Sequence, residues 1–290
     1  MVDLHCHTKN SDGTWSVIEL LKEAEKMNVD ILSITDHDTV KSHFELENIN
    51  IKDYYSGKII VGSEINCIFN KSKIELLCYD FDKENVQKWL DKKYNEEKIK
   101  ESFFEEFNDL INLCHKKNVK ISENLTYQLD MGYPFYIVHE DIKKYPENRK
   151  FFDEETWNSN KVFYRKCTTD ETFFMFDDFN KSLPQAKEVS DLIRKNGGKV
   201  FLAHLFIYEM DNHMSFLEEL KDANIIDGVE CFYSKFNDKQ IKLIENFCKS
   251  NNLFMSGGTD CHGEVTPNIK LGIGYGNLKV KQEEILKWIN

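Results

Sequence analysis

Residues 1–7 read MVDLHCH, and residues 31–38 read ILSITDHD. Each is a short apolar run that ends in imidazole or carboxylate side chains, which is typical of a buried strand with a polar end. Side chains alternate along a strand, so His5 and His7 share one face and Cys6 points the other way. These two segments predict neighbouring strands whose polar ends meet.

A helix is expected between these strands. Ser16 to Glu19 fits a capping box, in which the Ser and Glu side chains each satisfy a backbone N–H of the first helical turn. The alternation of strand and helix continues along the chain, and repeating β–α units predict a mostly parallel sheet, open or closed into a barrel. The other expected elements are strands at 58–69 and 74–79 joined by a hairpin at 70–73, a charged helical stretch at 84–118, helices at 184–196, 214–223, 238–250 and 282–289, and strands at 199–205, 227–232 and 253–256.

The stretch from 119 to 179 interrupts this alternation. It is dense in aromatic residues without clear periodicity, which predicts an inserted small subdomain or lid. We therefore expect a discontinuous barrel formed by residues 1–118 and 180–290, with the subdomain at 119–179. Within the subdomain, Val162 to Tyr164 predicts a strand.

Composition indicates a globular protein of the cytoplasm. Of the 290 residues, 41% are hydrophobic and 13% are aromatic, enough for a sizeable core. No apolar run approaches the roughly 20 residues of a membrane helix, and the acidic, histidine-rich start does not fit a secretory signal. The eight cysteines contain no CxxC pair, so we expect them to be reduced and mostly buried.

The net charge of −12 constrains the partners. An acidic surface repels nucleic acid in general, so no strong nucleic-acid footprint is predicted. A small phosphorylated substrate, including a nucleotide, remains compatible with this charge if bound metal ions supply local positive charge.

Residues with metal-ligand chemistry stand at the carboxyl ends of successive expected strands. In parallel α/β architectures the loops converge at that end, and ligands bind there. Imidazole and carboxylate ligands together suit Mn, Fe or Zn better than Ca or Mg. Cys6 and Cys261 alternate with these residues and are expected to pack behind the site. The residues concerned are His5, His7, Asp36, His37, Asp38, Glu64, His204, Asp260 and His262.

The order and spacing of these motifs resemble the PHP (polymerase and histidinol phosphatase) superfamily. The matching segments are His5-x-His7, Ser11-Asp12-Gly13, Thr35-Asp36-His37-Asp38, Gly62-Ser63-Glu64, Ala203-His204 and Gly258-Thr259-Asp260-Cys261-His262, over about residues 1–80 and 184–276. The chain looks most like the stand-alone metal-dependent phosphoesterases that include the nucleoside 3′,5′-bisphosphate phosphatases. The resemblance implies an α/β fold, a distorted (βα)7 TIM-like barrel, that holds two or three divalent cations.

The resemblance also implies a ligand set. Glu64 would bridge two metals, and Asp36 and Asp38 would orient His37 from behind. Glu64, His204 and Asp260 are the candidate catalytic residues. Mn²⁺ is the favoured ion, with Zn²⁺ and Fe²⁺ as alternatives. The first metal would take His5, His7, Glu64 and Asp260, the second Glu64 and His204, and the third Asp12, His37 and His262.

Glu75 departs from the family pattern. The family usually has a His 11 residues after the bridging Glu, where this chain has Glu75. A carboxylate also ligates Mn or Zn, so we expect Glu75 to bind the second metal. The alternative is an unbound Glu75 and a weak or absent second site. Leu205, where the family commonly has Pro, is expected to alter only a loop.

The expected activity is hydrolysis of a phosphomonoester of a small molecule, with a nucleotide or nucleoside bisphosphate as a candidate substrate. Bridged metal ions would activate a water and offset charge on the phosphoryl oxygens, so no Ser or Cys nucleophile is required. The alternatives are a 5′→3′ exonuclease on short RNA, a histidinol-phosphate phosphatase, and a degenerate metal-binding module without turnover.

A second anionic group on a substrate needs a cation outside the metal centre. Arg binds phosphate through two parallel N–H groups, and the chain has three Arg residues. Arg194 is predicted on a helix away from the strand ends. This leaves Arg165 and Arg149 in the insertion as candidate substrate-binding residues, and Arg165 is preferred.

Four further histidines lie outside the motifs. His43 and His115 fall in helical, charged stretches and are expected to face solvent. His139 and His213 are weaker candidates for contact with substrate.

Overall fold

The computed structural model describes residues 1–177, 179 and 182–289. Its centre is one seven-stranded sheet in which the strands follow chain order. Pairing is parallel, except that β4 runs antiparallel to both β3 and β5. The strands are β1 (Val2–Asp3), β2 (Ile31–Ile34), β3 (Lys58–Phe69), β4 (Ser72–Tyr79), β5 (Lys199–Leu202), β6 (Gly228–Tyr233) and β7 (Phe254–Gly258).

The sheet curls until its last strand meets its first. The backbone N–H of Leu4 donates to the carbonyl of Gly257 at 3.1 Å. Cys6 and Cys261 form a parallel bridge between the same two segments. The result is a nearly closed barrel, which confirms the predicted distorted TIM-like α/β barrel.

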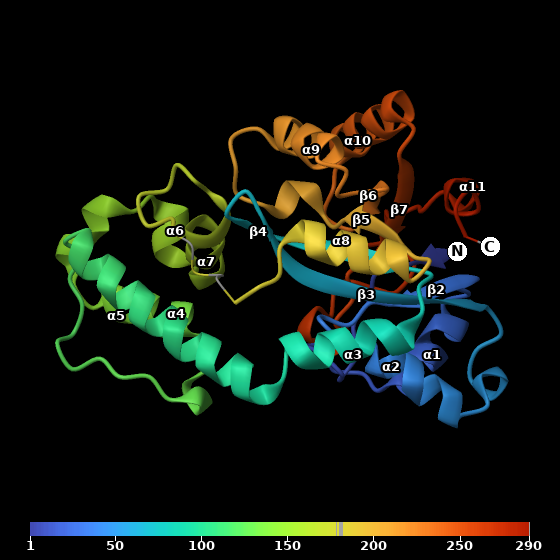
Figure 1. Ribbon diagram of the computed structural model, residues 1–290, viewed down its shortest axis with the longest axis horizontal. Coiled ribbons are helices and arrows are strands. Elements are labelled where there is room, and N and C mark those ends of the chain that lie inside the picture. The colour runs from blue at the N-terminus through green and yellow to red at the C-terminus, as the bar shows by residue number, and fades with distance from the viewer. Residues whose placement is uncertain (178, 180–181, 290) are drawn as a thin grey trace.

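Helices surround the barrel (Figure 1). The first one begins at the predicted capping box: the Ser16 side chain accepts from the Glu19 N–H, and Glu19 Oε2 accepts from the Ser16 N–H at 2.7 Å. The helices are α1 (Val17–Lys26), α2 (Lys41–Glu45), α3 (Lys83–Lys93), α4 (Glu96–Lys116), α5 (Pro134–Lys143), α6 (Glu154–Asn158), α7 (Asn160–Thr169), α8 (Ala186–Lys195), α9 (His213–Asp222), α10 (Asp238–Asn251) and α11 (Gln282–Ile285).

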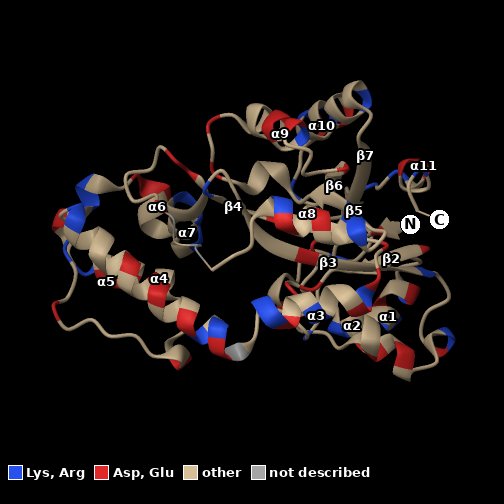
Figure 2. Ribbon diagram, in the orientation of Figure 1, with Lys and Arg blue, Asp and Glu red and all other residues tan. Residues whose placement is uncertain are grey.

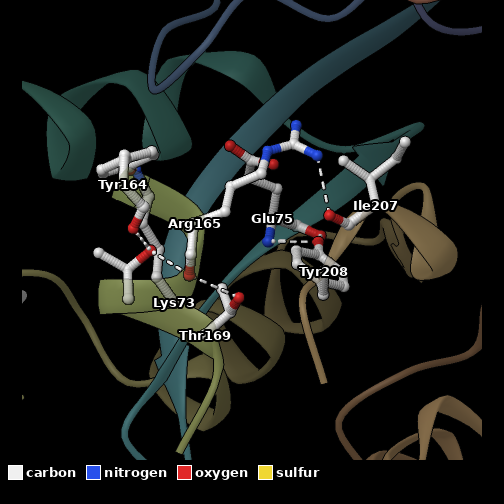
Figure 3. A pocket seen from close by; sticks show the side chains of 8 residues that line it. Lys73, Glu75, Tyr164, Arg165, Thr169, Ile207 and Tyr208 are labelled. Carbon is white, nitrogen blue, oxygen red and sulfur yellow. Dashed lines mark hydrogen bonds between the residues drawn. The ribbon is translucent and has the colours of Figure 1, made fainter. Parts of the chain in front are cut away.

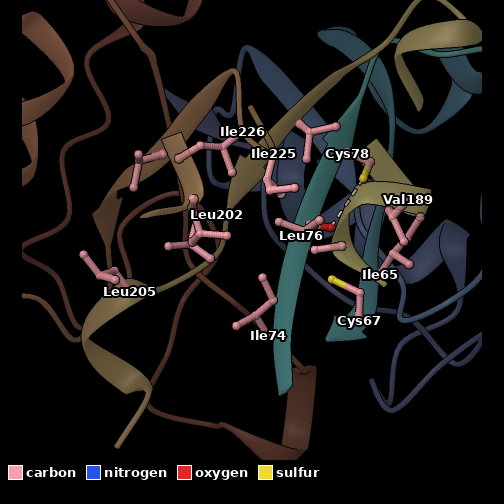
Figure 4. Close-up of a cluster of buried hydrophobic side chains, with 14 of the residues drawn as sticks. Ile65, Cys67, Ile74, Leu76, Cys78, Val189, Leu202, Leu205, Ile225 and Ile226 are labelled. Atoms are coloured by element: carbon pink, nitrogen blue, oxygen red, sulfur yellow. Dashed lines mark hydrogen bonds between the residues drawn. The ribbon is translucent and has the colours of Figure 1, made fainter. Parts of the chain in front are cut away.

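The strands bury both faces, which explains their nearly continuous apolar runs. Leu77 and Tyr79 of β4 point into the barrel, where they join a cluster that includes Trp288. Leu76 alternates with them and packs outward in a second cluster with Val189 of α8 (Figure 4). Each face of the sheet therefore packs against its own apolar cluster.

Helices α4 to α7 form a helical lobe beside the barrel (Figure 1). The lobe has its own buried cluster, to which α4 contributes Leu110 and Leu113, α5 contributes Phe135, and α7 contributes Phe163 and Cys167. Because α4 shares this core, the lobe begins before residue 119, where the insertion was expected to start. Its expected end at 179 borders residues 178, 180 and 181, which lie outside the described residues.

The expected helix at 282–289 ends at Ile285 and the expected strand at 199–205 ends at Leu202. Two further expected elements differ in type or number. Val162 to Tyr164 is not a strand but part of α7, because Ser159 caps the helix and the N–H of Val162 donates to its side chain. The aromatic residues at this position pack at helical spacing rather than alternating. The charged stretch 84–118 forms two helices rather than one. Helix α3 ends at Lys93, and the side chain of Asn95 caps the start of α4.

The cysteines and the helices agree with the composition. All eight cysteines are free and buried, as predicted, and Cys6 and Cys261 lie in the apolar cluster behind the strand ends. Among the described residues, no helix combines the length and apolar character needed to span a membrane.

Candidate metal centre

Nine side chains with metal-ligand atoms converge at one end of the barrel. They form three groups in which the candidate ligand atoms lie within 4.8 Å of one another. The sheet brings them together because most of them follow a strand of the same barrel, whereas Glu64 lies within β3 and Glu75 within β4. The groups are His5, His7 and Asp260; Glu64, Glu75 and His204; and His7, Asp12, His37 and His262.

Glu64 stands between the first two groups. Its Oε2 lies 3.1 Å from Nε2 of His5 and 3.3 Å from Nε2 of His7. Its Oε1 lies 3.0 Å from Nε2 of His204. The carboxylate is buried in β3 and directs one oxygen to each group, which is the arrangement that a bridging ligand needs.

Glu75 reaches the same imidazole from the neighbouring strand. Its Oε2 lies 3.1 Å from Nε2 of His204. In the β3–β4 ladder Glu75 is paired with Asn66, two residues beyond Glu64 and on the same face. A carboxylate at this position therefore contacts the second group.

Asp12 lies at the outer edge of the third group. Its Oδ2 is 3.2 Å from Nε2 of His262 and 3.8 Å from Nε2 of His37. The rings of His7 and His262 stack with centroids 4.2 Å apart. Asp12 is half-exposed whereas His7 is buried, so this group lies between the interior and the solvent.

The site balances imidazole cations against carboxylates. Burial lowers the pKa of His7, but the carboxylates of Asp260 and Glu64, each 3.3 Å from its Nε2, outweigh burial and raise the pKa to about 10. Burial also lowers the pKa of His204, but its contacts with Glu64 and Glu75 outweigh burial and raise the pKa to about 10. Burial would raise the pKa of Glu64, yet the neighbouring His5 and His37 hold that pKa well below its usual range. A divalent ion would replace the protons that now separate these carboxylates.

Several ring nitrogens are buried without a hydrogen-bond partner among the described residues. They include both nitrogens of His7, Nδ1 of His37 and Nδ1 of His204. Buried polar atoms are normally satisfied, so unpartnered imidazoles beside carboxylates need an explanation. Imidazole and carboxylate donors fit Mn²⁺, Fe²⁺ or Zn²⁺, and the described residues therefore suit divalent metal ions.

Glu230 contacts two of the ligand candidates, and the sequence motifs did not identify it. Nδ1 of His5 donates to its Oε1 at 2.8 Å, and the backbone N–H of His204 donates to its Oε2 at 2.8 Å. Glu230 is fully buried in β6. A single carboxylate inside an otherwise apolar strand was the available signal, because buried charges require partners.

Polar neighbours support other ligand candidates. Asp36 accepts hydrogen bonds from the N–H and hydroxyl of Thr8 at 2.6 and 2.7 Å. Asp38 accepts from the backbone and side-chain amides of Asn66 at 2.8 and 2.6 Å. Neither aspartate belongs to the three ligand groups, and both fix the loop around His37.

The two candidate substrate-binding residues lie in different places, Arg165 beside the ligand groups and Arg149 within the helical lobe. Arg165 lines a small pocket beside Glu75, and its Nη1 donates to the carbonyl of Ile207 at 2.8 Å (Figure 3). Arg149 instead donates to Phe152 and lies over the ring of Trp157 within the helical lobe.

The remaining histidines lie apart from the ligand groups. The prediction for His43 is wrong: its ring is buried because it packs against the end of β2, where Nε2 lies 2.8 Å from the carbonyl of Ile34. His115 is exposed, as predicted. His139 is buried in the lobe core against Phe163.

His213 was the other candidate for contact with substrate. It begins α9, and its Nε2 lies 2.8 Å from the carbonyl of Tyr208. It therefore stays with the loop after β5 and is in none of the three ligand groups.

Comparison with known proteins gives a family match and two similar folds. The family model for the PHP domain matches residues 3–151. A structure provisionally named a metal-dependent phosphoesterase, from Bifidobacterium adolescentis, has a TM-score of 0.60 at 18% identity, covering 98% of this chain and 94% of that one. An amidohydrolase from Chromobacterium violaceum has a TM-score of 0.63 at 17% identity, covering 94% and 90%. At these identities the likeness concerns the fold.

A curated relative matches over a shorter segment. The 5′-3′ exoribonuclease of Haemophilus influenzae is 37% identical over 81 residues, which is 28% of this chain and 29% of that protein. The alignment therefore spans less than a third of the relative's length.

Proposed function

This chain belongs to the PHP domain family, and on that premise we propose that it is a metal-dependent hydrolase of phosphomonoesters. One observation carries the proposal: Glu64 directs its two oxygens to separate groups of imidazoles and carboxylates, at 3.1 Å from His5 and 3.0 Å from His204. A shared carboxylate between two ligand groups is what a multi-metal hydrolytic site requires.

The nine converging residues would hold the ions, with Glu64, His204 and Asp260 as the catalytic set. Divalent ions in such a site lower the pKa of a coordinated water and offset charge that develops on a phosphoryl group. The protein's own contribution is orientation. The Tyr233 hydroxyl donates to Oδ2 of Asp260 at 2.7 Å, which leaves Oδ1 facing His5 and His7.

Charge favours an anionic substrate only after metal binding. Without metal, Asp12, Glu64, Glu75, Asp260 and buried Glu230 offset the charge of the protonated imidazoles, so the site has no positive charge to attract a phosphate. Three divalent ions exceed the charge of these five carboxylates. The loaded site would then attract a phosphate even though the whole chain carries −12.

The substrate we favour carries a second anionic group, as a nucleoside bisphosphate does. Arg165 and Lys73 line the pocket beside Glu75, together with Thr168 and Tyr164. The pocket volume is about 50 Å³, which suits a small anionic group rather than a base. We infer that Arg165 binds this second group, while Arg149 stays with the lobe core.

A 5′→3′ exonuclease is the second candidate, because one relative of that name aligns with 81 residues of this chain. A strand of RNA needs a continuous basic track. Lys143, Lys144 and Lys166 in the lobe are instead paired with Glu140, Asp141 and Asp153. Figure 2 likewise shows basic and acidic residues interspersed along the helices. These pairs favour the small phosphomonoester.

A substrate panel tests the proposal. Chelated protein reloaded with Mn²⁺ is assayed on a nucleoside 3′,5′-bisphosphate, a mononucleotide, histidinol phosphate and a short 5′-phosphorylated RNA. We expect phosphate release from the small esters and little shortening of the RNA. Faster shortening of RNA than release of phosphate would favour the exonuclease, and no turnover of any substrate would favour a non-catalytic module.

A further inference from the structure

Helix α7 joins the helical lobe to the strand that carries Glu75. Phe163 and Cys167 of α7 lie in the lobe core. The ring of Tyr164 packs against the same core, and its hydroxyl reaches β4. Nζ of Lys73 donates to the Tyr164 hydroxyl at 2.6 Å. Lys73 and Glu75 are two residues apart on β4 and therefore share a face.

The same helix also forms hydrogen bonds with the loop that follows His204. Nη1 of Arg165 donates to the carbonyl of Ile207 at 2.8 Å. The Thr169 hydroxyl accepts from the N–H of Glu209 at 3.1 Å and lies 3.3 Å from its carbonyl. These contacts fall on both sides of Tyr208, and Figure 3 shows Arg165 reaching across the pocket to Ile207.

Tyr208 completes a connection back to Glu75. The backbone N–H of Glu75 donates to the Tyr208 hydroxyl at 3.0 Å. Tyr208 is buried, and its ring centroid lies 5.5 Å from that of His204. Helix α7 thus contacts both segments that bring Glu75 and His204 to the second ligand group.

We propose that α7 is a brace that couples the position of the helical lobe to metal binding by Glu64, Glu75 and His204. Tyr164 and Thr169 act as positioning residues: they contact no ligand atom and instead hold β4 and the loop at 205–209. The inference rests on the proposed metal site, but not on the identity of the substrate.

The coupling has to act in both directions. If the docked α7 favours metal binding, then metal binding stabilises the docked α7 by the same factor. Loading the protein with Mn²⁺ is therefore expected to slow amide hydrogen exchange in residues 160–169. Exchange in α5, which lies in the lobe core away from β4, is expected to change less.

The matched variants remove hydrogen bonds with little change of shape. Tyr164→Phe removes the contact with Lys73, and Thr169→Val removes the contacts with Glu209. Tyr127→Phe is the control, because the Tyr127 hydroxyl donates to the carbonyl of Gly132 at 2.7 Å within the lobe. Mn²⁺ and Zn²⁺ affinities are measured for each equivalent by competition with a chelator.

We expect the Tyr164→Phe/Thr169→Val double variant to lose about tenfold in affinity for one metal equivalent, the scale of losing an outer contact to a ligand. The other equivalents and the Tyr127→Phe control should match the wild type. Equal affinities in all three proteins, or no change in α7 exchange on loading wild-type protein, would overturn the brace. Wild-type protein that binds no metal would instead overturn the proposed metal site.

Discussion

Nδ1 of His5 donates a 2.8 Å hydrogen bond to Oε1 of Glu230, a carboxylate that is fully buried in β6. A carboxylate only accepts, so Nδ1 carries a proton directed to Glu230, and Nε2 faces Glu64 and Asp260. The other oxygen of Glu230 holds the backbone of His204. One side chain thereby orients ligand candidates from two groups.

Replacing Glu230 by Gln should weaken metal binding. An amide has one acceptor oxygen, whereas His5 and the backbone of His204 both donate to this side chain. We expect a loss of about 10- to 100-fold in affinity, measured by chelator competition. Glu245→Gln is the control, since Glu245 is also buried but pairs with Lys281. Wild-type affinity in Glu230→Gln would show that His5 needs no such partner.

Substitutions of Glu75 test whether it binds metal. Its carboxylate lies 3.1 Å from Nε2 of His204. Glu75→Ala should lose one metal equivalent, as measured by elemental analysis, because the second group keeps only Glu64 and His204. Glu75→His should retain hydrolysis and shift preference toward softer ions. Unchanged stoichiometry and activity in Glu75→Ala would make Glu75 a bystander.

Arg165→Ala should discriminate between substrates. If its guanidinium binds a second phosphate, the substitution should lower kcat/KM more for a bisphosphate than for the matching monophosphate. The difference corresponds to about 2 kcal/mol of transition-state stabilisation. The lost hydrogen bond to Ile207 affects both substrates alike, so the ratio isolates the clamp. Arg149→Ala, which alters only the lobe, should leave that ratio unchanged. An equal effect of Arg165→Ala on both substrates would argue against the clamp.

His139 should make stability depend on pH. Burial lowers its pKa to about 4 despite the hydrogen bond to Asn160. Between its ordinary pKa of about 6.5 and pH 4, the unfolded chain binds a proton that the folded chain does not. The free energy of unfolding should therefore fall as the pH drops through this window, by at most about 3 kcal/mol.

Chemical denaturation at pH 7, 5.5 and 4 measures this effect. His139→Phe keeps the stacking on Phe163 and should lose part of the pH dependence. His115→Gln removes an exposed imidazole and should keep the wild-type slope. Identical slopes for wild type and His139→Phe would mean that His139 does not contribute.

The sequence predicted residues whose signal is local and missed residues whose partners are distant. His5, His7, Asp260 and His262 end strands in short motifs, so strand alternation and the common edge of the sheet were enough to bring them together. Glu230 has no motif around it, and its role depends on His5, 225 residues away.

The errors have the same origin. Val162 to Tyr164 has strand-forming residues, but the Ser159 cap and the lobe core select a helix. His43 lies in a polar segment, yet the packing of α2 under β2 buries it. In both cases tertiary packing, aided at α7 by the local Ser159 cap, overrides a weak local preference.

The most direct test follows phosphomonoester hydrolysis as Mn²⁺ is returned to chelated protein. The converging ligands predict no turnover without metal, a rise that saturates after two or three equivalents, and no recovery in Asp260→Asn. Turnover that persists after complete chelation, or protein that binds these equivalents and hydrolyses no phosphomonoester, would contradict a metal-dependent phosphoesterase.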